Sequence, residues 1–136
     1  MAIAQLATGT PGTDLIGSTT QISALNDVPA KIQQMIVPEL IVELGGAYGI
    51  NTEIALKIAR CESNLKQFGD NGKVIRGREN ASDVGVFQIN ERYHLKKSAD
   101  LGFDIETAEG NIEYAVWLMK HEGTRHWIWS KSCWNK

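Results

Sequence analysis

Hydrophobic residues recur at helical spacing in three long stretches of the chain. The first stretch, residues 29–37, places its apolar side chains on one helical face, namely Ile32, Met35 and Ile36. Because a residue that precedes proline disfavours the helical conformation, we expect this helix to stop at Val37. A new helix is then predicted to begin at Pro38 and to end near Gly49.

The second stretch, residues 52–63, follows Asn51, a residue type that favours the cap position before a helix. Its apolar stripe consists of Ile54, Ile58, Cys61 and Leu65. Glu62 lies beside this stripe in the same register as Ala55 and Ala59, so we expect it to border the buried face. The third stretch, residues 105–123, predicts a helix that ends at Gly123 and buries Ile112, Ala115, Val116 and Met119.

Between the second and third helices the pattern changes to turns and short apolar pairs. Asn71-Gly72 is a strong hairpin signal, and Val74-Ile75 is a strand candidate, so residues 69–86 predict a small β-lobe. Residues 84–95 are interpreted as a short helix or turn. Residues 1–28, rich in Gly, Thr and Ser, are expected to form a flexible tail or linker before a single domain, 29–136. The fold class predicted is α+β, mostly α-helical, with a small β-hairpin lobe.

Composition and charge narrow the classes of partner. The 136 residues are 43% hydrophobic and 22% charged, with a net charge of −2. This charge offers no basic surface for nucleic acid. No apolar run reaches the roughly 20 residues of a membrane span, and the N-terminus lacks the order of a signal peptide. The histidines and cysteines form no close ligand pair, so we expect no metal ion. We also expect no other cofactor, and we expect the protein to be a monomer.

Glu62 is the first candidate for chemistry. Apolar surroundings and the negative end of a helix both raise the pKa of a carboxyl group, which keeps it protonated closer to neutral pH. Such a group suits general acid catalysis. The alternative is an ordinary ion pair of Glu62 with Arg60 or Lys66 at the helix end.

The two cysteines, Cys61 and Cys133, leave two readings open from their number alone. They are either free thiols, as in many cytosolic proteins, or one bridge that closes a loop of about 70 residues.

A second group of candidate residues lies in the segment SDVGVFQIN. Asp83 precedes Gly85 by two residues, and Gln88 and Asn90 follow. A glycine allows close approach of a ligand, and the two amides suit hydroxyl and acetamido groups. Together with a protonated Glu62, a second acid and an amide-rich wall fit the cleavage of a glycosidic bond. The alternative is a turn in which Asp83 caps a helix.

Four segments in order carry a resemblance to a known family. They are CESNL, DVGVFQIN, EGNIEYAVWLM and the terminal W-x-W-x-x-x-C-W. Their order resembles the lysozyme-like superfamily, in particular soluble lytic transglycosylase (SLT) domains, and DVGVFQIN is also similar to chicken-type lysozymes. The match covers about residues 38–136. It implies a lysozyme-like fold and cleavage of peptidoglycan glycan strands.

The resemblance also assigns roles to individual residues. Glu62 corresponds to the family's acid, and Asp83 to the second carboxylate of chicken-type lysozymes, a position where many transglycosylases have no working acid. The residues expected to contact the glycan are Ser63, Gly85, Gln88, Asn90, Asn111, Tyr114 and Trp127. One or two of six aromatic residues are expected to line the cleft and the others to pack in the core, and the six are Tyr93, Tyr114, Trp117, Trp127, Trp129 and Trp134. A bridge between Cys61 and Cys133 is implied, and with it an extracytoplasmic location.

Two departures from the family pattern affect the predicted function. Transglycosylase domains often end in an Ala-Tyr-Asn motif whose tyrosine steadies the acid, whereas this chain has WSKSCWNK. The slightly acidic charge also removes long-range attraction to anionic cell walls. The missing tyrosine motif is the best support for a module without activity, but the SLT-like order of the motifs favours a transglycosylase that cleaves the bond between N-acetylmuramic acid and N-acetylglucosamine. A hydrolytic muramidase, a glycan-binding module without activity and a cytosolic helical adaptor remain alternatives.

Overall fold

The computed structural model describes residues 25–136, and most of them are helical. A short 3-10 helix, η1 (Leu25–Asp27), precedes the helices α2 (Ala30–Tyr48) and α3 (Thr52–Ser63). A two-stranded antiparallel sheet follows, made of β2 (Asp83–Val84) and β3 (Ile89–Asn90). The chain ends with α4 (Glu91–Asp100), α5 (Ala108–Glu122), η2 (Arg125–Ser130) and α6 (Lys131–Trp134). The predicted class, mostly helical with a small β-lobe, is confirmed, while the lysozyme-like fold stays a prediction.

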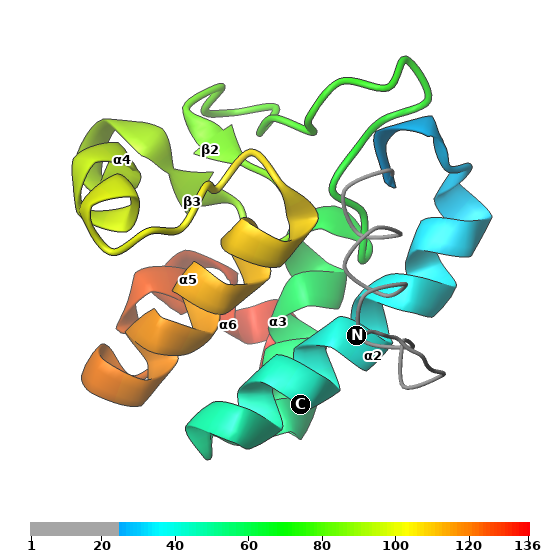
Figure 1. Ribbon diagram of the computed structural model, residues 1–136. Coiled ribbons are helices and arrows are strands. Elements are labelled where there is room, and N and C mark those ends of the chain that lie inside the picture. Colours follow the sequence, from blue (N-terminus) through cyan, green and yellow to red (C-terminus); the bar gives the residue numbers. More distant parts are fainter. Residues whose placement is uncertain (1–24) are drawn as a thin grey trace, which may run out of the picture.

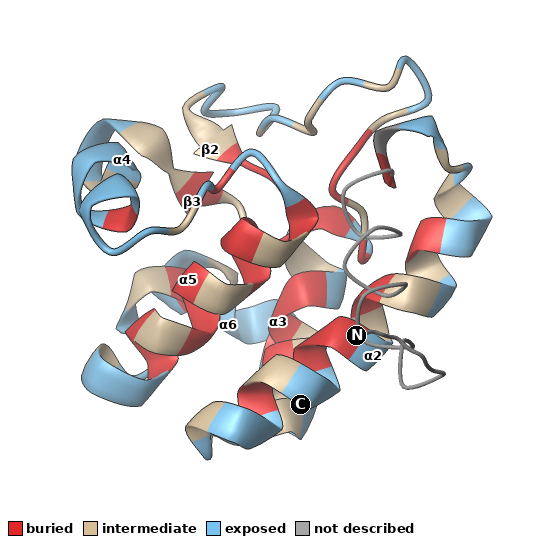
Figure 2. Ribbon diagram, in the orientation of Figure 1, coloured by how far each residue is buried: buried red, intermediate tan, exposed pale blue. Residues whose placement is uncertain are grey.

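The core lies between three helices. α2 packs on both α3 and α5, and α3 also contacts η2 and α6 (Figure 1). Figure 2 shows the buried residues on the facing sides of α2, α3 and α5, whereas α4 is mostly exposed. All four apolar residues predicted for the face of the third helix are buried, as expected: Ile112, Ala115, Val116 and Met119. The predicted cap is confirmed as well, since the Asn51 side chain accepts a hydrogen bond from the Ile54 N–H.

The break predicted at Val37 is wrong, because α2 continues through Pro38 to Tyr48. An internal proline removes one helical hydrogen bond and costs about 3 kcal/mol. Burial of Val37, Leu40 and Ile41 against neighbouring helices offsets this cost. The apolar face that we predicted for the first part of α2 is also wrong.

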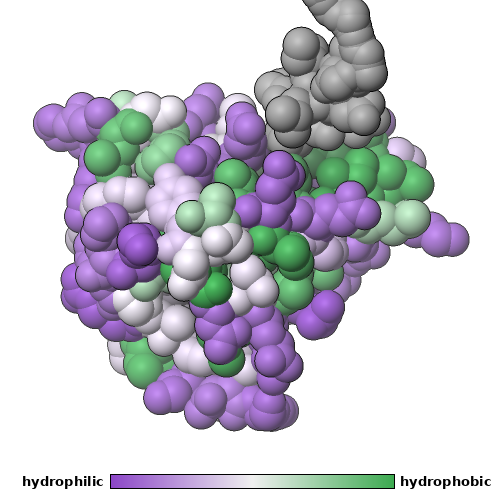
Figure 3. All heavy atoms as spheres, turned by 60° about the horizontal axis from the view of Figure 1, so that its bottom comes forward, coloured by the Kyte–Doolittle hydropathy of each residue, from purple (hydrophilic) through white to green (hydrophobic). Residues whose placement is uncertain are grey.

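The exposed side of α2 carries two of the residues that we expected inside, Ile32 and Met35, while Gln33 is buried. Figure 3 shows hydrophobic atoms on this side of the molecule in separate groups between polar ones. None of the helices in residues 25–136 combines the length and the hydrophobicity that a bilayer crossing requires.

The domain begins earlier than predicted. Leu25 is fully buried in the core, so residues 25–28 belong to the packed body, not to a tail. The rest of the predicted tail lies outside the described residues.

The β-lobe differs in detail from the prediction. The turn at Asn71-Gly72 is confirmed, with a single bridge between Phe68 and Val74 across it. The sheet itself pairs Asp83 with Asn90, and residues 84–95, predicted as one short helix or turn, contain β3 and the start of α4. Since only Ser98 of α4 is buried, this helix has no apolar stripe that sequence periodicity detects.

Cys61 and Cys133 form a disulfide with a Cα–Cα distance of 6.2 Å, which excludes the free-thiol reading. The bond links α3 to α6 and so ties the C-terminal segment to the end of the helix that carries Glu62. It is compatible with an oxidising, extracytoplasmic environment.

We expect the double variant Cys61→Ser/Cys133→Ser to lose about 4 kcal/mol of the free energy of unfolding, because the bridge closes a long loop in the unfolded chain. Urea denaturation of the variant beside the oxidised wild type measures this difference. Ser132→Ala, an exposed neighbour of Cys133, is the control and should match the wild type. A loss below about 1 kcal/mol would contradict the expectation.

Candidate active site

The site centres on Glu62, at the end of α3. The helix stops directly after it because Asn64 and Leu65 both adopt left-handed backbone conformations, with φ of 57° and 64°. This double reversal turns the chain away and leaves the Glu62 side chain, which is half-buried, at the edge of a cleft. Its carboxylate accepts a hydrogen bond of 2.6 Å from Ser130 Oγ. The alternative interpretation, an ion pair with Arg60 or Lys66, is therefore wrong, since the partner is a hydroxyl group.

Burial raises the pKa of the Glu62 carboxyl above its ordinary value. The hydrogen bond from Ser130 opposes this rise because it stabilises the ionised form, and the negative charge of Asp83 adds to it. The net direction is upward, which keeps Glu62 protonated at higher pH than an exposed glutamate. The direction agrees with the prediction, and so does the leading cause, since burial is the effect of the apolar surroundings expected from the sequence.

Asp83 lies on β2 and faces the same cleft as Glu62. Its Oδ1 accepts a hydrogen bond of 3.1 Å from Nδ2 of Asn90, the residue opposite it on β3. Burial raises the pKa of Asp83 and the bond from Asn90 opposes the rise. Asn90 also caps α4, since its Oδ1 accepts from the Arg92 N–H, so its amide holds both the second acid and the next helix.

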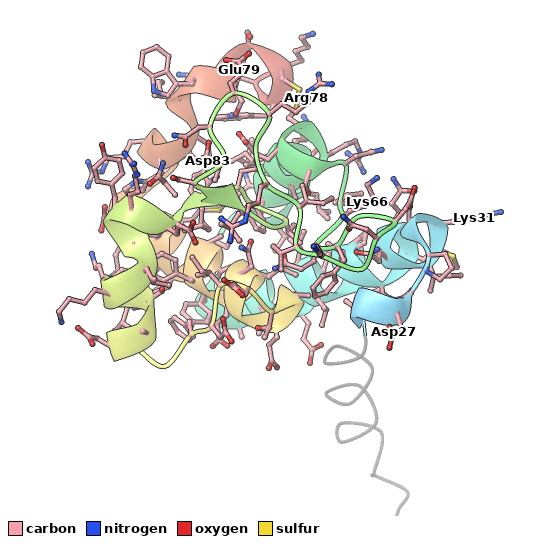
Figure 4. All side chains as sticks on the ribbon, turned by 90° about the horizontal axis from the view of Figure 1, so that it is seen from above. Asp27, Lys31, Lys66, Arg78, Glu79 and Asp83 are labelled. Atoms are coloured by element: carbon pink, nitrogen blue, oxygen red, sulfur yellow. A yellow bond between two sulfur atoms is a disulfide. The ribbon has the colours of Figure 1, made fainter. Side chains whose placement is uncertain are left out.

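The cleft consists of two adjoining hollows of about 950 and 370 Å³. Both are lined by the same central residues, which are Glu62, Asn80, Asp83, Gln88, Trp129 and Ser130. The larger hollow continues between the β-lobe and the end of α3, and the smaller one towards α4 and η2. Figure 4 shows Arg78 and Glu79 on the loop of the β-lobe beside the C-terminal segment, with Asp83 nearby. The two carboxyl groups thus stand at the middle of an open, elongated cleft.

Two aromatic rings are exposed beside the carboxyl groups. Trp129 is 95% exposed and lines both hollows, and Tyr93 is 81% exposed and lines the smaller one. An exposed ring at a polar cleft is available to stack on a ligand. Trp127, which we expected to contact the glycan, lines the smaller hollow but is only 4% exposed, and its Nε1 donates to the Phe87 carbonyl.

Three other predicted contact residues have structural roles. Gly85 and Asn111 are buried, and both amide atoms of Asn111 are bonded to backbone groups of the 84–87 turn. Ser63 is buried at the end of α3, where it caps its own helix end by contacts to Ala59 and Lys66, although it also borders the larger hollow. These positions keep the cleft wall in place.

Tyr114 is fully buried, and its hydroxyl lies 2.7 Å from Nδ1 of His94. Burial and the charge of Glu122 raise the pKa of Tyr114 to about 12. The tyrosine therefore supports the smaller hollow from behind, through His94 at its lining, and has no exposed surface for a glycan.

Three buried carboxamides form a support that the sequence did not indicate as a group. Gln67 accepts from the Val86 N–H and donates to the Ile105 carbonyl, while Asn111 accepts from the Phe87 N–H. Gln33 in turn accepts from the N–H groups of residues 67 and 68. A polar residue on an otherwise apolar helical face is a signal that would have found Gln33 on α2 and Asn111 on α5, whereas Gln67, in the loop after α3, has no such signal.

Other parts of the described structure are less suited to catalysis or metal binding. A separate hollow of about 420 Å³, at the end of α2, is lined by residues such as Tyr48, Ile54 and Met119 and has no carboxylate in its lining. Within residues 25–136, no three His, Cys, Asp or Glu side chains converge as metal ligands would.

Gly85 tests the support of the cleft wall. It has φ of +76°, and a Cβ there would lie 2.5 Å from amide atoms of Asn111 and Gln67. Gly49 has nearly the same φ, +75°, with nothing within 4 Å of its Cβ position. We expect Gly49→Ala to lose about 1 kcal/mol of unfolding free energy, and Gly85→Ala to lose about 3 kcal/mol or more because it adds a clash. Equal losses in urea denaturation would contradict this packing.

Comparison of the chain with protein-family models, with curated proteins and with solved structures found no match. The resemblance carried by the four segments therefore stays a prediction. The site itself combines a carboxyl group whose pKa is raised, a second carboxyl group and exposed aromatic rings in one cleft.

Proposed function

We propose that this protein cleaves the β-1,4 bond between N-acetylmuramic acid and N-acetylglucosamine in peptidoglycan, with Glu62 as the general acid and base. The observation that carries the proposal is the half-buried Glu62, whose pKa is raised, at the middle of a cleft that it shares with Asp83. An acid that stays protonated at higher pH than an exposed glutamate is suited to protonating a glycosidic oxygen.

The shape and lining of the cleft support a polymeric sugar substrate. The cleft extends on both sides of the carboxyl groups, so a chain bound along it would present an internal bond to Glu62. Trp129 and Tyr93 offer apolar faces to sugar rings, and Asn80 and Gln88 offer amides to hydroxyl and acetamido groups.

The proposed reaction starts with transfer of the Glu62 proton to the bridging oxygen, which leaves as a hydroxyl group while the C1–O bond breaks. Positive charge then develops at C1 and is stabilised by ionised Asp83 or by the acetamido group of the substrate. Glu62, now ionised, takes a proton from the nucleophile. If the nucleophile is the 6-hydroxyl of the muramic acid, the product is a 1,6-anhydro sugar and no water is consumed. We favour this transglycosylase outcome because the motif order is that of SLT domains.

A hydrolytic muramidase is the second candidate. Asp83 favours it, because a second carboxyl group that lines both hollows with Glu62 is positioned for electrostatic or nucleophilic help. In that case water attacks C1. A binding module without activity would use the same aromatic rings and would not need a protonated Glu62.

We expect Glu62→Gln to lower kcat on peptidoglycan by at least roughly 100-fold, because the amide has no acidic proton to give. Release of soluble muropeptides, analysed by mass spectrometry, measures both the rate and the product. Glu53→Gln, an exposed position in the first turn of the same helix, is the matched control and should keep full activity. An inactive wild type that binds glycan would indicate the binding module.

The same digestion decides between the two enzymes when Asp83→Asn is included. A transglycosylase that relies on the acetamido group gives anhydro products and keeps most of its activity in this variant. A hydrolase gives products that all carry one added water, and it loses activity together with Asp83. The second result would overturn our preferred outcome.

Trp129→Ala should raise KM about fivefold, because stacking of about 1 kcal/mol is lost, and should leave stability unchanged since the ring is almost fully exposed. Ile128→Ala is the control: its side chain is also exposed but does not line the cleft. Equal KM values for the two variants would show that the ring takes no part in binding.

A further inference from the structure

We propose that Ser130 is a positioning residue that holds Glu62 by its Oε2 atom and leaves Oε1 as the atom that exchanges the proton with the sugar linkage. This inference rests on the proposed function. The Ser130 Oγ–Glu62 Oε2 distance is 2.6 Å, within the range of a charge-assisted hydrogen bond to a carboxylate. Among the described residues, no other side chain or backbone group donates to Glu62.

Ser130 has a second acceptor for its single hydrogen. Its Oγ lies 3.2 Å from the Trp127 carbonyl oxygen, which also accepts from Nε1 of Trp134. A hydroxyl donates one hydrogen at a time and has lone pairs to accept another. Ser130 therefore donates to Glu62 when the carboxylate is ionised, and its hydrogen is free to turn to Trp127 when Glu62 is protonated. Both protonation states that an acid–base cycle passes through then have a satisfied partner.

The disulfide limits how far Ser130 moves from Glu62. Cys61 directly precedes Glu62, and Cys133 follows Ser130 by three residues, so the bond and the hydrogen bond close a small ring. A side chain fixed in this way keeps its reactive atom oriented. Such orientation increases the rate of the reaction more than the affinity for the substrate.

The pH dependence distinguishes this role from a merely structural one. Glu62 must be protonated to act as the acid, so activity falls on the alkaline side as Glu62 ionises. Removal of the Ser130 hydroxyl takes a donor away from the ionised form, which raises the pKa of Glu62 and moves the alkaline limb to higher pH. The same change loosens the orientation of the acid and lowers kcat.

The test compares kcat and KM across pH for the wild type, Ser130→Ala and Ser130→Thr on soluble glycan fragments, with circular dichroism as the check on folding. We expect Ser130→Ala to lose roughly 10- to 100-fold in kcat at an unchanged KM, with its alkaline limb at higher pH. Ser130→Thr retains the hydroxyl and should restore the position of the limb. Ser132→Ala, an exposed serine outside the cleft, should match the wild type.

A folded Ser130→Ala protein with the kcat and alkaline limb of the wild type would overturn the inference. The proposed function fails separately, if the wild type and Glu62→Gln are equally inactive. In that case NMR of the Glu62 carboxyl group still tests the hydrogen bond, because it needs no activity. A titration midpoint that is the same in the wild type and in Ser130→Ala would contradict the hydrogen bond from Ser130. If Ser130→Ala does not fold, the test uses Ser130→Thr instead. An alkaline limb at a different pH in Ser130→Thr than in the wild type would then contradict the inference.

Discussion

Three buried carboxamides are the constraint on which the rest of the site depends. The β-lobe has only two short paired strands, too few to be stable alone, so its backbone groups need partners from elsewhere. Gln33, Gln67 and Asn111 supply these partners from α2, the loop after α3 and α5. Because a buried amide that loses its partner is costly, the network fixes the lobe on the helical body and with it the wall that carries Asp83.

The opposite wall of the cleft is held by a disulfide and a hydrogen bond. The end of α3 and the C-terminal segment are joined covalently by the disulfide, and Glu62 and Ser130 meet beside it. Burial favours the protonated form of Glu62, whereas the hydroxyl of Ser130 favours the ionised form. A group under two opposed influences is suited to the proposed reaction, in which Glu62 would act first as an acid and then as a base.

Sequence patterns predicted what depends on local rules. The Asn51 cap, the end of α3 near Glu62 and the apolar face of α5 follow from capping and periodicity. The cleft was located through Glu62, Asp83 and Gln88, all of which line it. Positions governed by tertiary packing were missed. Pro38 stays within a helix because its neighbours are buried, Asn111 and Tyr114 turn inward, and Ser130 meets Glu62 across 68 residues of sequence. No local pattern reports such distant contacts.

The proposed role of Glu62 requires a carboxyl group with a raised pKa in a cleft where it can give its proton to a ligand. The most direct measurement is a titration of the Glu62 side-chain carboxyl by NMR in the wild type, assigned by comparison with Glu62→Gln. We expect a midpoint clearly above the ordinary value of an exposed glutamate, with a further change when a glycan fragment is added. A midpoint at the ordinary glutamate value, unaffected by glycan, would refute this role of Glu62.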